Sequence, residues 1–120
     1  MSKMRSMSTV EFKPLMAPAL GNRKGTREAI DVLVDGEALS TALDAAPLDR
    51  VAVQSMPQAA WFRDGALQPV VCQCGDSMCS DVTTIVRREG VLVRWTLPNG
   101  RAVVFEPELA TESLRAALRQ

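Results

Sequence analysis

The sequence contains no histidine and no tyrosine. Histidine is the side chain that most often acts as a general base and activates a serine or cysteine nucleophile. Aromatic residues make up only 4% of the chain. No window approaches the roughly 18 consecutive apolar residues that a membrane-spanning helix needs, and we expect no such helix. These absences favour a non-enzymatic role, with no catalytic residues.

An excess of charge of one sign is also lacking, since Lys plus Arg and Asp plus Glu both number 14. Nucleic-acid binding through bulk charge is therefore not indicated. The charges are nevertheless unevenly placed. Residues 1–27 carry six bases and one acid (net +5), residues 28–86 two bases and nine acids (net −7), and residues 87–120 six bases and four acids (net +2). Such asymmetry can guide a protein partner or pair internally.

The first eight residues carry charge but are followed by no apolar run, which argues against a secretory signal and favours the cytoplasm. The chain has three cysteines, an odd number that fits poorly with a secreted disulfide framework. At 120 residues with 47% hydrophobic content, the sequence predicts one globular domain over residues 1–120, with residues 1–8 as a loose segment.

The first half of the chain predicts a hairpin followed by a helix. Residues 9–15 alternate in polarity and contain Pro14, which confines a strand to a sheet edge. Residues 29–34 form the second strand, ending at the turn signal Asp35-Gly36, and the loop between the strands is basic. Apolar residues at helical spacing predict a helix over residues 37–45, and residues 51–53 predict a short strand.

The second half predicts four consecutive antiparallel strands and a closing helix. The strands cover residues 67–74, 82–88, 91–97 and 101–105, and Asn99-Gly100 is a strong hairpin signal. From Pro107 onward, an apolar stripe at i, i+4, i+7 and i+8 predicts a C-terminal helix. The expected fold is therefore α+β, an antiparallel β-meander with one or two helices packed against it.

All three cysteines lie within eight positions, at Cys72, Cys74 and Cys79. Residues two apart on a strand share a face, and the following turn can return Cys79 to the same end of the hairpin. Three readings stay open: buried structural thiols, a zinc site, or a redox pair in which Cys74 and Cys79 bridge across the turn and Cys72 is the odd thiol. Zinc prefers four ligands in structural sites, so the fourth ligand would be Asp76, Asp81, water or a second chain.

Around the cysteines the sequence resembles a widespread group of small uncharacterised bacterial proteins. Their shared pattern is C-x-C-G-x-x-x-C at the end of a strand, followed by a V-x-W strand, which here is Val93-Arg94-Trp95. An earlier I-x-V-x-V-D-G-x-x-L element is similar to residues 30–39. The resemblance touches most of residues 28–118 and implies a fold and a bacterial source, without an established activity. An aromatic residue and a proline often follow the last cysteine in that group, whereas Ser80 and Asp81 follow it here.

Two functions are expected from these observations. The first is a protein-binding module that takes no cofactor, most concretely an immunity protein that covers the basic active site of a cognate toxin with an acidic surface. The second is a thiol-based zinc-binding or redox protein that uses Cys72, Cys74 and Cys79. The candidate partner contacts for the first function are Asp31, Asp35, Glu37, Asp44, Asp49, Trp61 and Phe62.

Overall fold

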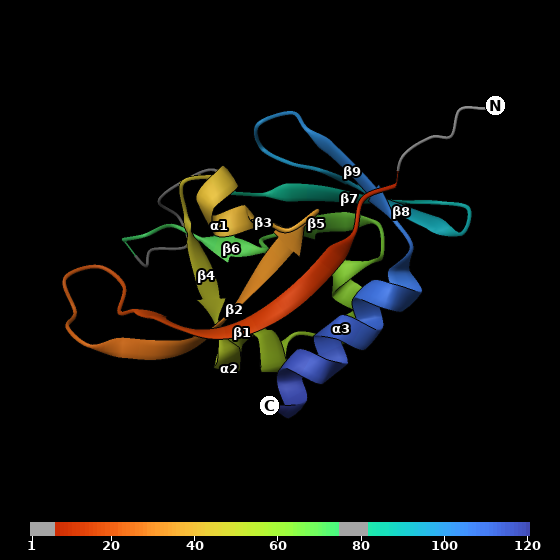
Figure 1. Ribbon diagram of the computed structural model, residues 1–120. Coiled ribbons are helices and arrows are strands. Elements are labelled where there is room, and N and C mark those ends of the chain that lie inside the picture. The colour runs from red at the N-terminus through yellow and green to blue at the C-terminus, as the bar shows by residue number, and fades with distance from the viewer. Residues whose placement is uncertain (1–6, 75–81) are drawn as a thin grey trace.

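Two antiparallel sheets and a C-terminal helix build an α+β fold, as the sequence predicts (Figure 1). The computed structural model describes residues 7–74 and 82–120. Within them, one sheet has the order β1-β2-β4-β6 with β3 beside β2, and the other has the order β5-β7-β8-β9. The elements are β1 (Val10–Pro18), β2 (Thr26–Val34), β3 (Glu37–Ala38), α1 (Leu39–Ala42), β4 (Ala46–Asp49), α2 (Arg50–Ser55), the 3-10 helix η1 (Gln58–Trp61), β5 (Gly65–Leu67), β6 (Val70–Val71), β7 (Thr84–Glu89), β8 (Leu92–Thr96), β9 (Ala102–Phe105) and α3 (Pro107–Arg119).

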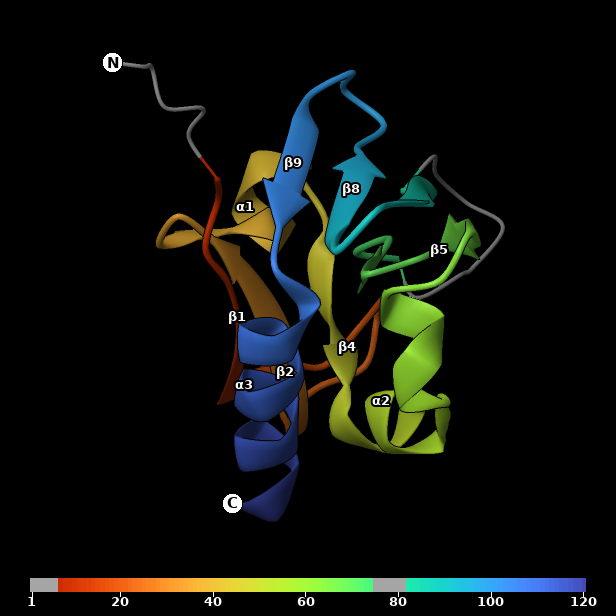
Figure 2. The ribbon, with the colours of Figure 1, turned by 90° about the vertical axis from the view of Figure 1, so that its right-hand side faces the viewer.

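Strand β1 is an edge strand, as the proline within it requires. The backbone N–H of Phe12 points away from β2 and donates to Ser113 Oγ of α3 at 2.8 Å. Because successive strand N–H groups alternate in direction, Pro14 and Pro18 occupy the same outward register, where no ladder bond is lost. Helix α3 runs alongside β1, and Figure 2 shows it in front of the β1–β2 hairpin. The edge is thus covered by a helix and blunted by two prolines.

The second sheet is the predicted meander with one change. Strands β7, β8 and β9 pair in sequence order, and Val93 and Trp95 face the core as the alternation predicts. The strand expected over residues 67–74 is instead divided into β5 and β6, which belong to different sheets. Pro69 lies between them, and a proline restricts both its own backbone and that of the residue before it. The two sheets are therefore connected by the short segment between β5 and β6.

Two expectations for the middle of the chain were wrong. The turn at Asp35-Gly36, with φ of 52° and 85°, pairs Glu37 and Ala38 with β2 as strand β3, so the helix begins only at Leu39 and lasts one turn. The expected strand at residues 51–53 is helix α2, in which Val53 is buried and Val51 is exposed. In both places the apolar pattern covers only a few residues and fits a strand and a helix equally well. The neighbouring turn then determines which of the two elements forms.

The core is built around aromatic side chains. The sequence has three phenylalanines and two tryptophans, and all of them join one series of ring contacts. Phe12 meets Trp61 with centroids 5.0 Å apart, Trp61 meets Trp95 at 6.3 Å, and Trp95 meets Phe105 at 4.9 Å. The apolar stripe of α3 closes this cluster from the side of β1 through buried Ala110, Leu114 and Ala117. No helix among the described residues is long and apolar enough to cross a membrane.

One buried hydroxyl offers a direct test of this core. Thr84 of β7 is fully buried, and its Oγ1 has no hydrogen-bond partner among the described residues. A buried polar group without a partner costs about 1–3 kcal/mol. We expect Thr84→Val to raise the free energy of unfolding by about 1 kcal/mol, because valine replaces the hydroxyl by a methyl group.

Urea denaturation measures this change, and Thr96→Val is the matched control, since Thr96 is exposed on the neighbouring strand β8. The control corrects for the higher strand propensity of valine. Equal gains in the two variants would show that the Thr84 hydroxyl carries no penalty.

Candidate functional site

The two described cysteines lie at the end of β6, which stops at Val71. Residues 73 and 74 form a turn instead of continuing the strand, so the prediction of a strand that runs through Cys74 was wrong. The turn brings the two side chains together, with Cys72 Sγ and Cys74 Sγ 3.1 Å apart. Cys72 is half-buried and Cys74 is exposed. Cys79, Asp76 and Asp81, the remaining predicted ligands, lie outside the described residues.

The loop of the β1–β2 hairpin holds this cysteine segment in place. Gly21 donates its backbone N–H to Gln73 O at 3.1 Å, and the Gln73 amide nitrogen approaches Ala45 O at 3.5 Å. Gly21 has a φ of 64°, and a Cβ added there would stand 2.9 Å from Cys74 O. A side chain at this position would therefore meet both a strained backbone and a steric clash. The sequence showed the glycine in a loop but gave no sign that it touches the cysteines.

A cavity of about 410 Å³ lies beside the cysteine segment, between the hairpin loop and β4. Gln73, Gly21 and Ala45 line it, together with Arg27. The Arg27 guanidinium is fixed on both sides, because it donates to Pro18 O at 3.0 Å and to Asp49 Oδ1 at 2.8 Å. Of the cysteine segment, Gln73 lines this cavity, while the cysteines on either side of it are not among the lining residues.

The distance between the sulfur atoms bears on the chemistry of the pair. A disulfide needs a sulfur–sulfur distance of about 2.05 Å and a Cα separation of roughly 4.4–6.8 Å, which residues two apart meet when the chain turns. Two thiolates on a tetrahedral zinc ion, each about 2.3 Å from the metal, stand about 3.8 Å apart. The observed 3.1 Å lies between these two values. Among residues 7–74 and 82–120, no group of three Cys, His, Asp or Glu side chains is placed to hold a metal ion.

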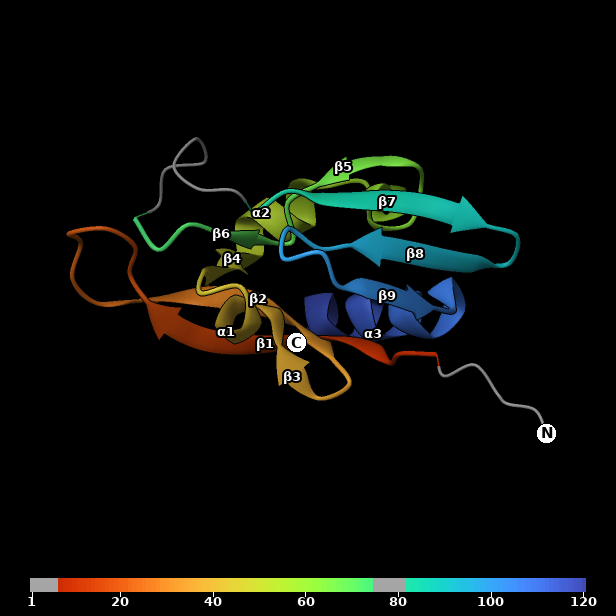
Figure 3. The same cartoon turned by 90° about the horizontal axis from the view of Figure 1, so that it is seen from above.

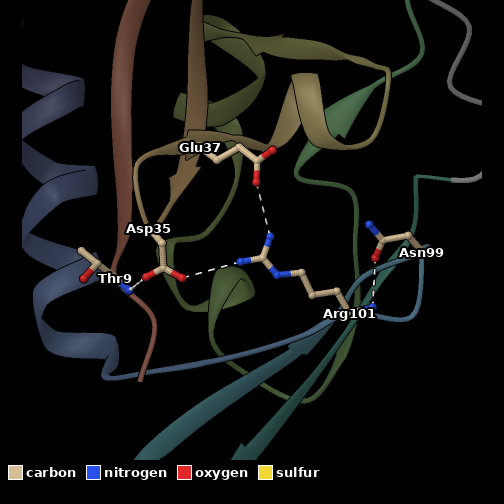
Figure 4. Close-up of polar contacts among 5 residues, drawn as sticks. All are labelled: Thr9, Asp35, Glu37, Asn99 and Arg101. Carbon is tan, nitrogen blue, oxygen red and sulfur yellow. Dashed lines mark hydrogen bonds and ion pairs between the residues drawn. The ribbon is translucent and has the colours of Figure 1, made fainter. Parts of the chain in front are cut away.

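Two of the predicted acidic contacts are engaged within the chain. Figure 4 shows Arg101 between the two carboxylates, with Nη2 3.6 Å from Asp35 Oδ2 and Nη1 3.5 Å from Glu37 Oε1. Asp35 also accepts the N–H of Thr9 at 2.9 Å, and Asn99 Oδ1 accepts the N–H of Arg101 at 2.9 Å. This cluster connects the β2–β3 turn with the β8–β9 turn, and so one sheet with the other. These two acids are thus paired with an arginine of the same chain, which is one of the two outcomes that the uneven charge distribution allows.

The other three predicted acids have separate environments. Asp49 pairs with Arg27 as described, and Asp44 is exposed with a φ of 53°. Asp31 is buried, with 5% of its surface exposed, and accepts hydrogen bonds from Ser40 Oγ at 2.5 Å and Val32 N at 2.8 Å. The prediction that Asp31 contacts a partner was therefore wrong, because its carboxylate is directed toward α1 inside the molecule.

The predicted aromatic contacts were also wrong. Trp61 and Phe62 are 1% and 7% exposed and belong to the aromatic core. The irregular sequence around them suggested a surface loop, but η1 turns both side chains inward. Trp61 O accepts the indole N–H of Trp95 at 3.0 Å, which fixes this turn to the second sheet. The surface proposed for a toxin thus loses its two aromatic anchors.

The sequence gave no indication of an open groove between η1, β7 and α3. Its volume is about 660 Å³, and its walls carry three arginines and two glutamates around Phe62 and Pro107. The charged residues are Arg63, Arg88, Arg115, Glu108 and Glu112. Both signs of charge line the walls in nearly equal number, so the groove favours no ligand of one charge.

Comparison of the chain with models of protein families, with curated proteins and with solved structures finds no match.

Proposed function

We propose that this chain is a dithiol protein in which Cys72 and Cys74 exchange with disulfides of other molecules. The observation that carries the proposal is the 3.1 Å separation of the two sulfur atoms at an accessible turn. A redox pair needs only two thiols, and both are described. The accessible member is Cys74, which suits the first attack, and half-buried Cys72 suits the second.

The proposed reaction is thiol–disulfide exchange, in which the substrate disulfide is itself the oxidant and no other is needed. The Cys74 thiolate attacks one sulfur of the substrate disulfide, breaks its S–S bond and releases one thiolate. The Cys72 thiolate then attacks Cys74 Sγ in the mixed disulfide and releases the second thiolate. The two protons lost by the cysteines go to the two released thiolates. One substrate disulfide is reduced to two thiols, and the Cys72–Cys74 pair is oxidised to an internal disulfide.

The other expected functions stay predictions. Zinc binding needs ligands beyond the two described thiols, and Cys79 is the first candidate. An immunity-protein role has lost Asp31, Trp61 and Phe62 as contacts, while three of its remaining acids are paired with arginines. A dithiol that cycles between two states suits a reducing compartment, which supports our proposal that the protein acts in the cytoplasm of a bacterium.

The test uses Cys72→Ser, Cys74→Ser and Cys79→Ser variants of the full chain, each incubated with oxidised and reduced glutathione. We expect Cys79→Ser to form a reversible internal disulfide, because it retains both members of the pair. Cys72→Ser and Cys74→Ser should stop at the mixed disulfide with glutathione, which mass spectrometry of the intact chain distinguishes.

Two results would overturn the proposal. An internal disulfide that forms only when Cys79 is present would assign the chemistry to another pair. Stoichiometric zinc in the purified wild type, lost in each cysteine variant, would establish the metal site instead.

A further inference from the structure

We infer that the disulfides accepted by Cys72 and Cys74 are anionic, because a basic hairpin loop lies on the cysteine segment. This inference rests on the proposed dithiol function and adds the chemical class of its substrate. The loop comprises residues 19–25 between β1 and β2 and is called the hairpin tip below. Figure 3 shows it at one end of the molecule, opposite the β7–β8 turn.

The hairpin tip is closed by its own hydrogen bonds and contacts the backbone of the cysteine segment. The N–H of Ala19 donates to Gly25 O at 3.0 Å and closes the loop, and Arg23 N donates to Leu20 O within it. The bond from Gly21 to Gln73 O then connects the loop to the residue between the two cysteines. The absence of a side chain at Gly21 allows the loop backbone to reach Cys74 O. The position of the tip beside the backbone of Gln73 and Cys74 is therefore set by backbone contacts.

The charge of the hairpin tip is not neutralised by other described residues. Arg23 and Lys24 are both exposed, and in the described part of the chain neither lies within 4.0 Å of a carboxylate. Arg27, by contrast, forms an ion pair with Asp49. Arg23 and Lys24 follow Gly21, whose N–H donates to Gln73 O, by two and three positions along the same loop. Asp76 and Asp81, two acids of the adjoining sequence, lie outside the described residues.

Charges beside a reactive group change the rate at which charged reactants arrive. Electrostatic steering raises association rates by about tenfold to a thousandfold when the site and the ligand have opposite charge. The effect acts over the Debye length, which is about 30 Å at 0.01 M salt and about 3 Å at 1 M. A disulfide with carboxylates is therefore expected to react faster than a cationic one at low salt, and the preference should vanish at high salt.

The experiment measures second-order rates with three disulfides: the dianion dithiobis(nitrobenzoate), neutral dithiodipyridine and the dication cystamine. Each rate is divided by that of β-mercaptoethanol, a neutral thiol, with the same disulfide at the same pH, which removes intrinsic reactivity. Wild type and Cys79→Ser are compared, so that the described pair is measured alone. We expect normalised rates about tenfold higher for the dianion than for cystamine at about 0.01 M salt, converging at about 1 M.

Charge-neutral variants locate the effect. Arg23→Gln/Lys24→Gln should abolish most of the preference, and Arg87→Gln/Arg119→Gln, which removes equal charge from β7 and the end of α3, should retain it. Equal or reversed normalised rates, or a preference that survives the loss of Arg23 and Lys24, would overturn this inference and leave the dithiol function intact. Failure of all three disulfides to react would overturn the dithiol function, and this inference with it.

Discussion

Replacement of Trp95 by alanine is expected to remove about 3–5 kcal/mol from the free energy of unfolding. Trp95 is fully buried and sits in the middle of the aromatic series, in contact with both Trp61 and Phe105. Its indole N–H also bonds to Trp61 O, so the variant leaves a cavity and a buried carbonyl without its donor. Domains of this kind are stable by about 5–15 kcal/mol, so the loss is a large part of the whole.

Chemical denaturation followed by circular dichroism measures the effect, and Trp95→Phe is the control. Phenylalanine preserves most of the ring contacts and loses only the hydrogen bond and some volume, so a smaller loss of about 1–2 kcal/mol is expected. A loss below about 1 kcal/mol for Trp95→Ala would mean that the two sheets do not depend on this contact.

Removal of the Asp31 carboxylate is expected to have the second largest effect. Asp31→Ala leaves the Ser40 hydroxyl and the Val32 N–H without their acceptor, at a site where both are buried. Ser40 N, which lies 3.4 Å from Asp31 Oδ1, loses a third, weaker contact. We expect a loss of about 2–4 kcal/mol, because hydrogen bonds to charged acceptors exceed those between neutral groups and unmet buried donors carry a penalty.

A double-mutant cycle with Ser40→Ala separates the pair from its surroundings. The coupling between Asp31 and Ser40 should be at least about 1 kcal/mol, and Asp31→Asn, which retains an acceptor oxygen, should lose less than Asp31→Ala. Additive losses in the cycle would show that the short contact between the two side chains contributes little to stability.

The fold was predictable wherever local signals agreed. Asn99-Gly100 and Asp35-Gly36 mark real turns, β8 alternates as predicted, and α3 follows its apolar stripe. One prediction failed at α2, where a few apolar residues fit both the helical and the strand period. Another failed at β5 and β6, because long-range strand pairing assigns these two short segments to different sheets. No local pattern encodes which distant strand a short segment will meet.

The candidate site was predictable only in part. The spacing of Cys72 and Cys74 indicated that their side chains lie together, and the structure places them so, through a turn instead of a strand. The contact from Gly21 spans about half the chain, and nothing near either residue signals it. The sequence shows charge but not the arginine that a charge meets, as Asp35 and Glu37 meet Arg101.

The contact series of five aromatic rings also has an optical consequence. Without tyrosine, nearly all near-ultraviolet absorption of the chain arises from two tryptophans, both 1% exposed or less. Their rings are 6.3 Å apart and inclined by 39°, close enough for their electronic transitions to couple. Fluorescence and near-ultraviolet dichroism therefore report on the junction of the two sheets alone, and the surface contributes no background. The molecule therefore carries its own probe of core packing, which needs no label.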